Sequence, residues 1–494
     1  MAKALVFSSH ILWESHYETE LEIIQNHINA GDDVIQLVCN SSFEVCDTNG
    51  KHDFPKCVSC ISKRQHGVSL LSQKIKQIPV ISLSSEEKEI VKNFTWKSGS
   101  IEDLKAIHYQ NYDIGYSVAS SIISLLFNPN PDLEKNAGLV NQFFKSSLEV
   151  YFSIITHLKQ HKPDVIYVFN GRLAQTKAAF KAAAHLGVKC LIHERGSTYK
   201  HYDLFENFLP HDILRMEGKI RDFWKDNTNE AFKRERSAFF YQQRRKGTIL
   251  SWKSFTDKQM KGLLPEGFDL TKKNLVIYNS SEFEFTAVSP EWDNPIYANQ
   301  NEGIIRIIES MQAYPEYHIY VRLHPNLAEA DPENYHILKA LSYDNLTLIL
   351  PNDSIDSYHL LDNAYKVVTF GSTMAIEATY WKKVSIMAGH GFFENLDVVH
   401  KPINHQNMIE MILNDELQVK TGDGADIFGY FYADSGIFFQ YYEPATYNTG
   451  SFKGEVLKTD LNSKSQKWMN RYWVYRKYSF LEKFLKKMVL KHID

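Results

Sequence analysis

The sequence lacks an apolar run long enough to cross a bilayer. Its longest candidate, Val118–Phe127, contains three serines and is about half the ~20 residues that a spanning helix needs. The first residues, Met1–Phe7, lead directly into a strand pattern and lack the apolar core and cleavage site of a secretory leader. We therefore expect a cytoplasmic protein, with any membrane contact peripheral and on the inner membrane face.

Strong charge and abundant cysteine are also missing. The 55 Lys and Arg against 59 Asp and Glu give a net charge of −4, which creates no overall field that attracts nucleic acid. Five cysteines in a cytoplasmic chain do not predict disulfides. Four of them are clustered: Cys39, Cys46, Cys57 and Cys60. Thiolates at such spacing bind a structural zinc ion or an iron–sulfur centre, and buried thiols without metal are the alternative interpretation.

The chain is too long for one hydrophobic core, and predicted strands alternate with predicted helices along most of it. This alternation favours an α/β fold with parallel sheets. We expect two Rossmann-like domains that face a central cleft, with helical insertions and a C-terminal helix. The expected divisions are an N-terminal domain 1–268, with a cysteine-rich insertion 39–66 and a helical region 69–153, then a second domain 269–430 and an aromatic, basic helical region 431–494.

Polar residues follow two predicted strands of the first domain. Pro163–Phe169 and Val188–Ile192 are joined by an alanine-rich helix, which makes a βαβ unit. Open α/β sheets bind ligands at the carboxyl ends of their strands. The candidate catalytic residues at these ends are Asn170, Arg172, Glu194 and Arg195. Glu194 is the candidate general base, and a structural ion pair between Glu194 and Arg195 is the alternative.

The second domain has polar residues at or just after the ends of three predicted strands, Lys273–Tyr278, His318–His324 and Val367–Phe370. The two-residue period of a strand predicts that Arg322 and His324 share one face. Hydroxyl, imidazole and guanidinium groups at such an edge are suited to a phosphate. The candidate ligand-binding residues of this domain are Ser280, Ser281, Glu284, Arg322, His324, Asn326, Gly371, Ser372, Thr373 and Glu377, and the family resemblance described below implies that their ligand is a nucleotide sugar. The alternative at Ser372 is an ordinary strand-to-helix turn in which its hydroxyl caps the helix. No Asp-x-Asp pair follows a predicted strand, which favours a site that needs no metal or other cofactor for catalysis.

The C-terminal stretch Ser463–Asp494 is predicted to be helical and is basic, with nine Lys and Arg against two Asp and Glu. Tryptophans and tyrosines are interleaved with these cations. Such a mixture suits docking on an anionic membrane surface. Packing of a C-terminal helix on the first domain is the alternative.

Three short motifs carry a resemblance to a known family: Glu194-Arg-Gly196, Arg322-Leu-His-Pro325 and Gly371-Ser-Thr373. In this order they resemble the acidic-Gly, His-Pro and Ser-Ser/Thr motifs of GT-B glycosyltransferases that build bacterial capsular and O-antigen polysaccharides. The similarity is greatest to the group of the Kdo transferases and bacterial sialyltransferases. The resemblance implies that His324, Ser372 and Thr373 bind the nucleotide phosphate, that Glu377 binds the ribose or base, and that the acidic-Gly motif supplies the catalytic carboxylate.

Together these expectations describe transfer of a sugar from a nucleotide-activated donor. A CMP-sugar such as CMP-Kdo is favoured over a UDP-sugar, and the expected acceptor is a bacterial surface polysaccharide, lipopolysaccharide or glycolipid. Two alternatives stay open. One is a hydrolysing nucleotide-sugar 2-epimerase with the same fold, and the other is a catalytically silent protein that docks other polysaccharide enzymes.

Overall fold

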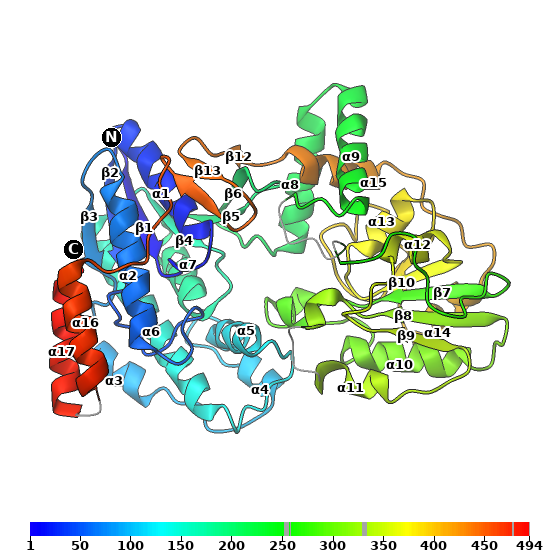
Figure 1. The fold of residues 1–494 in the computed structure, drawn as a ribbon, viewed down its shortest axis with the longest axis horizontal. Helices are drawn as coiled ribbons and strands as arrows, with labels where there is room; N and C mark the ends of the chain where they lie inside the picture. The colour runs from blue at the N-terminus through cyan, green and yellow to red at the C-terminus, as the bar shows by residue number, and fades with distance from the viewer. Residues whose placement is uncertain (251–255, 257, 329–332, 477–478, 494) are drawn as a thin grey trace. The chain divides into compact units, whose positions relative to one another are not determined.

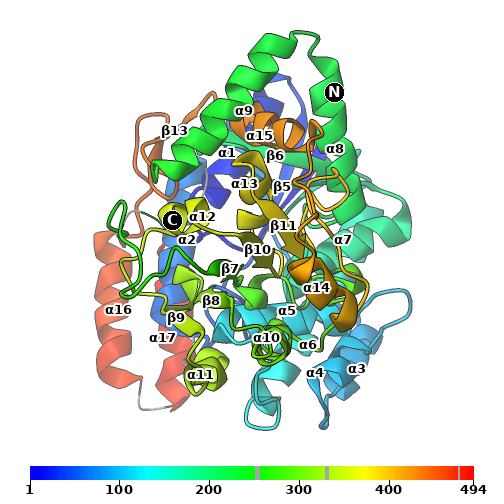
Figure 2. The same ribbon diagram turned by 90° about the vertical axis from the view of Figure 1, so that its right-hand side faces the viewer.

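The computed structural model describes residues 1–250, 256, 258–328, 333–476 and 479–493. Of the basic C-terminal stretch, Lys477, Tyr478 and Asp494 lie outside the described residues. The chain divides into two compact units (Figure 1). Unit 1 contains residues 1–125, 131–210 and 436–494, and unit 2 contains residues 126–130 and 211–435. Figure 2 shows the strands of the unit 2 sheet with their helices towards the viewer.

Unit 1 is built on a sheet with the strand order β12-β6-β5-β4-β1-β2-β3, in which β5, β4, β1, β2 and β3 run parallel. Its strands are β1 (Lys3–Ser8), β2 (Asp33–Val38), β3 (Lys76–Pro79), β4 (Val165–Phe169), β5 (Lys189–Arg195), β6 (His201–Glu206), β12 (Ile437–Phe438) and the separate hairpin β13 (Tyr442–Pro444) with β14 (Gly450–Phe452). Its helices are α1 (His16–Asn29), α2 (Phe54–Ser69), α3 (Ser85–Asn93), α4 (Ile101–Lys105), α5 (Ile114–Leu126), α6 (Ala137–His161), α7 (Ala174–Leu186), α16 (Ser463–Tyr475) and α17 (Ser479–Lys491).

Unit 2 is built on a parallel sheet with the strand order β11-β10-β7-β8-β9. Its strands are β7 (Lys273–Tyr278), β8 (Tyr317–Arg322), β9 (Leu346–Ile349), β10 (Lys366–Thr369) and β11 (Val384–Met387). Its helices are α8 (Ile213–Asp226), α9 (Glu230–Arg245), α10 (Gln300–Met311), α11 (Glu333–Lys339), α12 (Ser357–Asp362), α13 (Met374–Tyr380), α14 (His405–Leu413) and α15 (Gly424–Asp434). The predicted α/β class, with two Rossmann-like parallel sheets, is confirmed.

The central strands of both sheets are continuous apolar runs because helices cover both of their faces. In unit 1, Leu5 and Val6 of β1 are fully buried, and helix α1 covers this sheet with Leu21 and Ile24. In unit 2, residues 275–277 of β7 are fully buried in the same way. Among the described residues, no helix combines the length and the apolarity needed to span a bilayer.

The first domain was expected to end at residue 268, whereas the chain already passes into unit 2 at residue 211. The helices α8 and α9 therefore belong to unit 2. Residues 211–250 carry many charges, but α9 buries Phe240 and Tyr241 and packs on α15 of unit 2. The Tyr241 hydroxyl donates to the Ala425 carbonyl at 2.7 Å. Because the apolar face of α9 packs on α15, this charged segment belongs to the unit that contains the second sheet.

Two expected features of unit 1 differ in their details. The cysteine-rich segment 39–66 is not an insertion, because it contains most of α2, the helix that connects β2 to β3. The region 69–153 contains the helices α3, α4, α5 and most of α6, and it also contains β3, a four-residue edge strand that no pattern indicated because half of its residues are polar and its side chains are exposed or half-buried.

The end of the chain completes unit 1. Strand β12 pairs antiparallel with β6, and the backbone N–H groups of Gln440, Tyr441 and Tyr442 donate to the Glu22 carboxylate at 2.8, 2.8 and 3.0 Å. Glu22 is fully buried in α1. The segment after residue 435 thus supplies the hydrogen bonds that a buried carboxylate requires.

Candidate functional site

The carboxyl ends of three adjacent strands meet at one edge of unit 2. Strand β7 lies between β10 and β8, and all three are parallel. The segments that leave them begin at Asn279, Leu323 and Phe370. Because open α/β sheets bind ligands at this edge, the residues predicted to bind phosphate lie at the ligand-binding edge of the sheet.

Gly371 forms the turn after β10. Its φ of 112° is strained for any residue with a side chain, and a Cβ there would lie 2.7 Å from the His390 carbonyl oxygen. Directly after it, the Ser372 hydroxyl accepts a hydrogen bond from the Met374 N–H at 3.3 Å. The predicted tight turn is therefore present, and it leaves Ser372 and Thr373 partly exposed.

His324 is the best-defined polar group of this edge. Its Nδ1 accepts a hydrogen bond from the Asn326 N–H at 3.2 Å and lies 3.1 Å from the Ser281 hydroxyl. Since Nδ1 is an acceptor, the ring proton is on Nε2. Burial, and then the guanidinium groups of Arg322 and Arg244, lower the pKa of His324 to about 4. At neutral pH the ring is an uncharged hydrogen-bond donor with a fixed tautomer.

The depressed pKa of His324 makes stability depend on pH. Between pH 6.5 and 4 the unfolded chain binds a proton that the folded protein rejects. Neutral His324 makes its full contribution to the free energy of unfolding above pH 6.5. This contribution, about 3 kcal/mol in total, is lost as the pH falls towards 4. We expect urea denaturation to show this loss in the wild type but not in His324→Asn, which does not titrate. Identical pH dependence of the two proteins would contradict the assignment.

The neighbours of His324 divide into two groups. Asn326 faces the site, with its side-chain NH₂ donating to Glu284 at 2.8 Å, and Ser281 contacts the imidazole. Ser280 is turned away, since its hydroxyl lies 3.3 Å from both the Gln300 side-chain oxygen and the Phe370 carbonyl. Ser281, rather than Ser280, is the hydroxyl that contacts His324.

The Arg322 side chain is directed away from this group. It is 2% exposed, and its guanidinium donates to the backbone carbonyls of Leu350 and, at 3.2 Å, Asp353. Strand β8 ends at Arg322, so the two-residue alternation that was expected to place Arg322 and His324 on one face does not continue to His324. In the structure Arg322 holds the turn after β9, although its charge still acts on His324.

Glu377 lies in α13 and is fully buried. One of its oxygens accepts from Arg244 Nε at 2.8 Å, and the other accepts from the Tyr358 hydroxyl. Arg244 also donates to the Thr373 hydroxyl at 3.0 Å. Burial by itself lowers the pKa of the Arg244 guanidinium, but the adjacent Glu377 raises it by more. The pKa of Arg244 is therefore raised overall. Glu377 thus holds Arg244 against the turn that carries Ser372 and Thr373, and its expected role in nucleoside binding stays a prediction.

Sequence reasoning missed Arg244 as a residue of this site. It lies in the last turn of the charged helix α9, 133 residues before Glu377. The basic sequence Arg244-Arg245-Lys246 was the available signal, but no periodicity links it to the strand ends.

The corresponding edge of unit 1 carries the candidate base. Glu194 is at the end of β5, accepts from the Asn170 side-chain NH₂ at 2.8 Å and from the Arg195 N–H at 3.0 Å, and lies 3.8 Å from His16 Nδ1. Burial, followed by the charge of Arg195, lowers the pKa of His16 well below its usual range. The structure therefore brings Asn170, Glu194 and Arg195 together, and it adds His16, whose position at the start of helix α1 did not indicate a role in the site.

Arg172 lies next to this group but points elsewhere. Its guanidinium donates to the Ser120 hydroxyl at 2.9 Å, in helix α5. Its backbone N–H is 3.3 Å from the Asn170 side-chain oxygen. Arg172 therefore contacts Asn170 through its backbone rather than through its charge.

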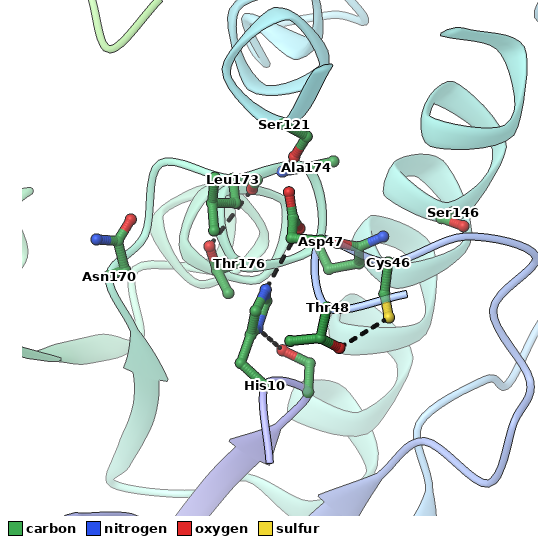
Figure 3. A network of polar contacts seen from close by, with 12 residues as sticks. His10, Cys46, Asp47, Thr48, Ser121, Ser146, Asn170, Leu173, Ala174 and Thr176 are labelled. Atoms are coloured by element: carbon green, nitrogen blue, oxygen red, sulfur yellow. Dashed lines mark hydrogen bonds and ion pairs between the residues drawn. The ribbon is translucent and has the colours of Figure 1, made fainter. Parts of the chain in front are cut away.

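A buried carboxylate occupies the start of α7 in the same unit. Asp47 Oδ2 is 3.3 Å from His10 Nε2, and the Ser9 hydroxyl is 2.7 Å from His10 Nδ1. Asp47 points towards the first residues of α7, near Ala174 (Figure 3). The N-terminus of a helix is where Rossmann-like units place a phosphate, and in unit 1 the Asp47 carboxyl group lies near this position.

The four clustered cysteines are half-buried and not bonded to one another as disulfides. The Cys46 thiol lies 3.2 Å from the Thr48 hydroxyl, and the Cys57 thiol accepts from Asn49 at 3.3 Å. Burial raises the pKa of Cys46 to about 12 and that of Cys57 above its ordinary value. Within the described parts of the chain, no three His, Cys, Asp or Glu side chains are arranged to hold a metal ion. The metal site at Cys39, Cys46, Cys57 and Cys60 stays a prediction that metal analysis of the purified protein would test.

Comparison with known proteins gives structural similarities at low sequence identity. No protein-family model and no curated protein sequence matches the chain. The beta Kdo 2,4 transferase KpsC of Thermosulfurimonas dismutans is similar over 55% of this chain and 79% of that chain, with 12% identity and a TM-score of 0.35. The S. aureus MnaA–UDP co-structure is similar over 86% and 94%, with 12% identity and a TM-score of 0.27. The Methanocaldococcus jannaschii UDP-GlcNAc 2-epimerase in complex with UDP-GlcNAc and UDP is similar over 86% and 97%, with 13% identity and a TM-score of 0.28. At TM-scores below 0.5 these similarities do not establish a family.

Proposed function

We propose that the protein is a glycosyltransferase that uses a nucleotide-activated sugar and binds the nucleotide phosphate at the strand ends of unit 2. The observation that carries this proposal is the arrangement around His324. The neutral imidazole of His324 with its proton on Nε2, the Ser281 hydroxyl and Thr373 lie on segments that leave three adjacent parallel strands, and Arg244 of α9 donates to the Thr373 hydroxyl. These are hydrogen-bond donors suited to an anion with several oxygens.

The chemistry follows from the charge that develops during transfer. The bond between the anomeric carbon and the phosphate oxygen breaks, and negative charge grows on the departing nucleotide phosphate. Arg244 and the Nε2–H of His324 are assigned to stabilise that charge, which preorganised donors do without reorganisation. The acceptor hydroxyl forms the new bond to the anomeric carbon and gives its proton to Glu194, the candidate base of unit 1.

The finer assignments are also proposals. The motif resemblance favours a CMP-sugar, with CMP-Kdo first, over a UDP-sugar, and a bacterial surface polysaccharide or glycolipid as acceptor. A metal-independent reaction is proposed because Arg244 supplies positive charge beside Thr373. Release of an epimerised sugar from the donor without any acceptor would instead identify a hydrolysing 2-epimerase.

A nucleotide screen tests the proposal directly. We expect one of CMP, UDP and GDP to raise the thermal midpoint, since a ligand that binds only the folded state stabilises it by about 2.7 kcal/mol at a concentration 100 times its Kd. Differential scanning fluorimetry with each nucleotide and its sugar measures this shift. If no nucleotide shifts the midpoint, the glycosyltransferase proposal fails and a silent docking protein is favoured.

Substituting His324 by asparagine tests the proposed phosphate contact while keeping the hydrogen bond that holds the local backbone. An asparagine side chain can keep an acceptor near the Nδ1 position for the Asn326 N–H but loses the Nε2–H donor. A hydrogen bond to a charged group contributes about 1.5–3 kcal/mol, so nucleotide affinity should fall about 10- to 150-fold. Isothermal titration calorimetry measures the affinity, and the same substitution at His318, on β8 but bonded to Thr347, is the control. Unchanged affinity in His324→Asn would remove His324 from the phosphate site.

A further inference from the structure

Helices α16 and α17 form a pair that is attached to unit 1 through one face (Figure 1). Met469 and Tyr472 of α16 and Leu485 and Val489 of α17 are buried in one cluster. This cluster also contains Phe54, Val58 and Ile61 of α2. The Asn462 side chain caps α16 and donates to the His492 carbonyl at 2.7 Å, which ties the two ends of the pair together. The inner face of the helix pair is thus fully used in folding.

The outer face of the same pair carries rows of cations. The exposed cations of α16 are Lys464, Lys467 and Arg471, and those of α17 are Lys483, Lys487 and Lys491. Spacings of three and four residues place each set on one side of its helix. Glu482 is the one acidic residue among the described residues from 463 to 493, and it is paired with Lys486 at 2.7 Å. The described stretch 463–493 therefore contains no further acidic residue that could neutralise the exposed cations of the outer face.

Large apolar side chains are exposed beside these cations. Val474 is 62% exposed, Phe484 is 52% exposed, and Trp473 and Tyr475 are each 45% exposed. Phe484 contacts Trp468 edge-on, with ring centroids 6.2 Å apart, which links the two helices. Exposed tryptophan, tyrosine and phenylalanine next to lysine and arginine are typical of a surface that enters the interface of a bilayer.

We propose that the outer face of the α16–α17 pair docks on a bilayer that contains anionic phospholipids. The stretch 463–494 has a net charge of +7, whereas the whole chain has −4, so an anionic surface attracts this stretch and repels the remainder. A soluble polyanion would use the cations alone, whereas the interface of a bilayer also accepts Val474 and Phe484. The inference goes beyond the proposed function, and its test uses no nucleotide.

Vesicle co-sedimentation of the full chain tests the proposal. We expect binding to vesicles of phosphatidylcholine with 30% phosphatidylglycerol, weakening with added salt, and little binding to phosphatidylcholine alone. Each cation near such a surface contributes about fivefold in affinity, so Lys483→Gln with Lys487→Gln should weaken binding about 25-fold. Val474→Ser with Phe484→Ser should weaken it as well, because the apolar contact is lost.

The matched control is Lys88→Gln with Lys97→Gln, two exposed lysines of unit 1 outside the helix pair, and it should bind as the wild type does. Circular dichroism confirms that each variant is folded. Three results would overturn the proposal: no binding to the anionic vesicles, equal loss in the control, or binding that the Val474 and Phe484 substitutions leave unchanged. In the last case, equal affinity for dextran sulfate would identify a polyanion-binding surface instead.

Discussion

Replacing Glu194 by glutamine is expected to slow sugar transfer by about 10²- to 10⁴-fold, the usual contribution of a general base. Glutamine has the same shape and can still accept from Asn170, but it cannot take a proton from the acceptor hydroxyl. The loss of one acceptor for the Arg195 N–H should cost only about 1 kcal/mol of stability. The turnover rate with saturating donor and acceptor measures the effect.

The affinity for the nucleotide should stay unchanged in Glu194→Gln, because the proposed phosphate contacts belong to unit 2 and Glu194 belongs to unit 1. Glu206→Gln is the control in the same unit, since Glu206 is an exposed residue that pairs with Lys189. Turnover of Glu194→Gln within threefold of the wild type would show that the base is another group. His16, 3.8 Å away, would then be the next residue to substitute.

Replacing Arg244 by alanine is expected to have two separate consequences. The first is a loss of stability of about 3 kcal/mol, because the fully buried Glu377 carboxyl group loses its charged partner. This figure is at the low end for a broken buried pair, since the Arg244 side chain is 37% exposed. The second is a fall in nucleotide affinity of about 10- to 150-fold, because a charged hydrogen-bond donor beside Thr373 is lost.

Two further variants separate these consequences. Arg244→Ala combined with Glu377→Gln removes the unpaired charge, so stability should partly recover while nucleotide affinity stays low. Arg234→Ala on the same helix is the control, since its pairs with Asp423 and Asp426 are exposed and contribute about 1 kcal/mol or less. If the double variant binds nucleotide as tightly as the wild type, Arg244 is only a structural partner of Glu377. Urea denaturation and calorimetry give the two readouts.

The positions of the strand ends could be predicted because parallel strands are continuous apolar runs that stop at polar residues. Lys273–Tyr278 is the observed β7, and the turn at Gly371 follows β10 as expected. The order of these strands in the sheet then brings their ends together without any knowledge of side-chain contacts. That is why the segments around Ser281, His324 and Ser372 could be found from the sequence.

Side-chain pairing could not be predicted in the same way. The bond from Arg244 to Glu377 joins residues 133 positions apart, and no local pattern specifies it. The direction of Arg322 depends on two backbone carbonyls after β9, which a two-residue period does not describe. The charged helix α9 falls within the expected first domain 1–268, whereas the burial of Phe240 and Tyr241 depends on α15, almost 200 residues later.

The contact between Glu22 and residues 440–442 has a consequence for biosynthesis. Residues 211–435 form nearly all of unit 2 and leave the ribosome before the segment that completes unit 1. During that time the N–H groups of residues 440–442, which donate to the fully buried Glu22 in the native structure, have not yet been synthesised. Strand β6 likewise lacks its neighbour β12. Since domains fold as units once their residues are available, unit 2 can fold on the nascent chain while unit 1 waits for its last strand. The unit that is synthesised first is thus the one that finishes folding last.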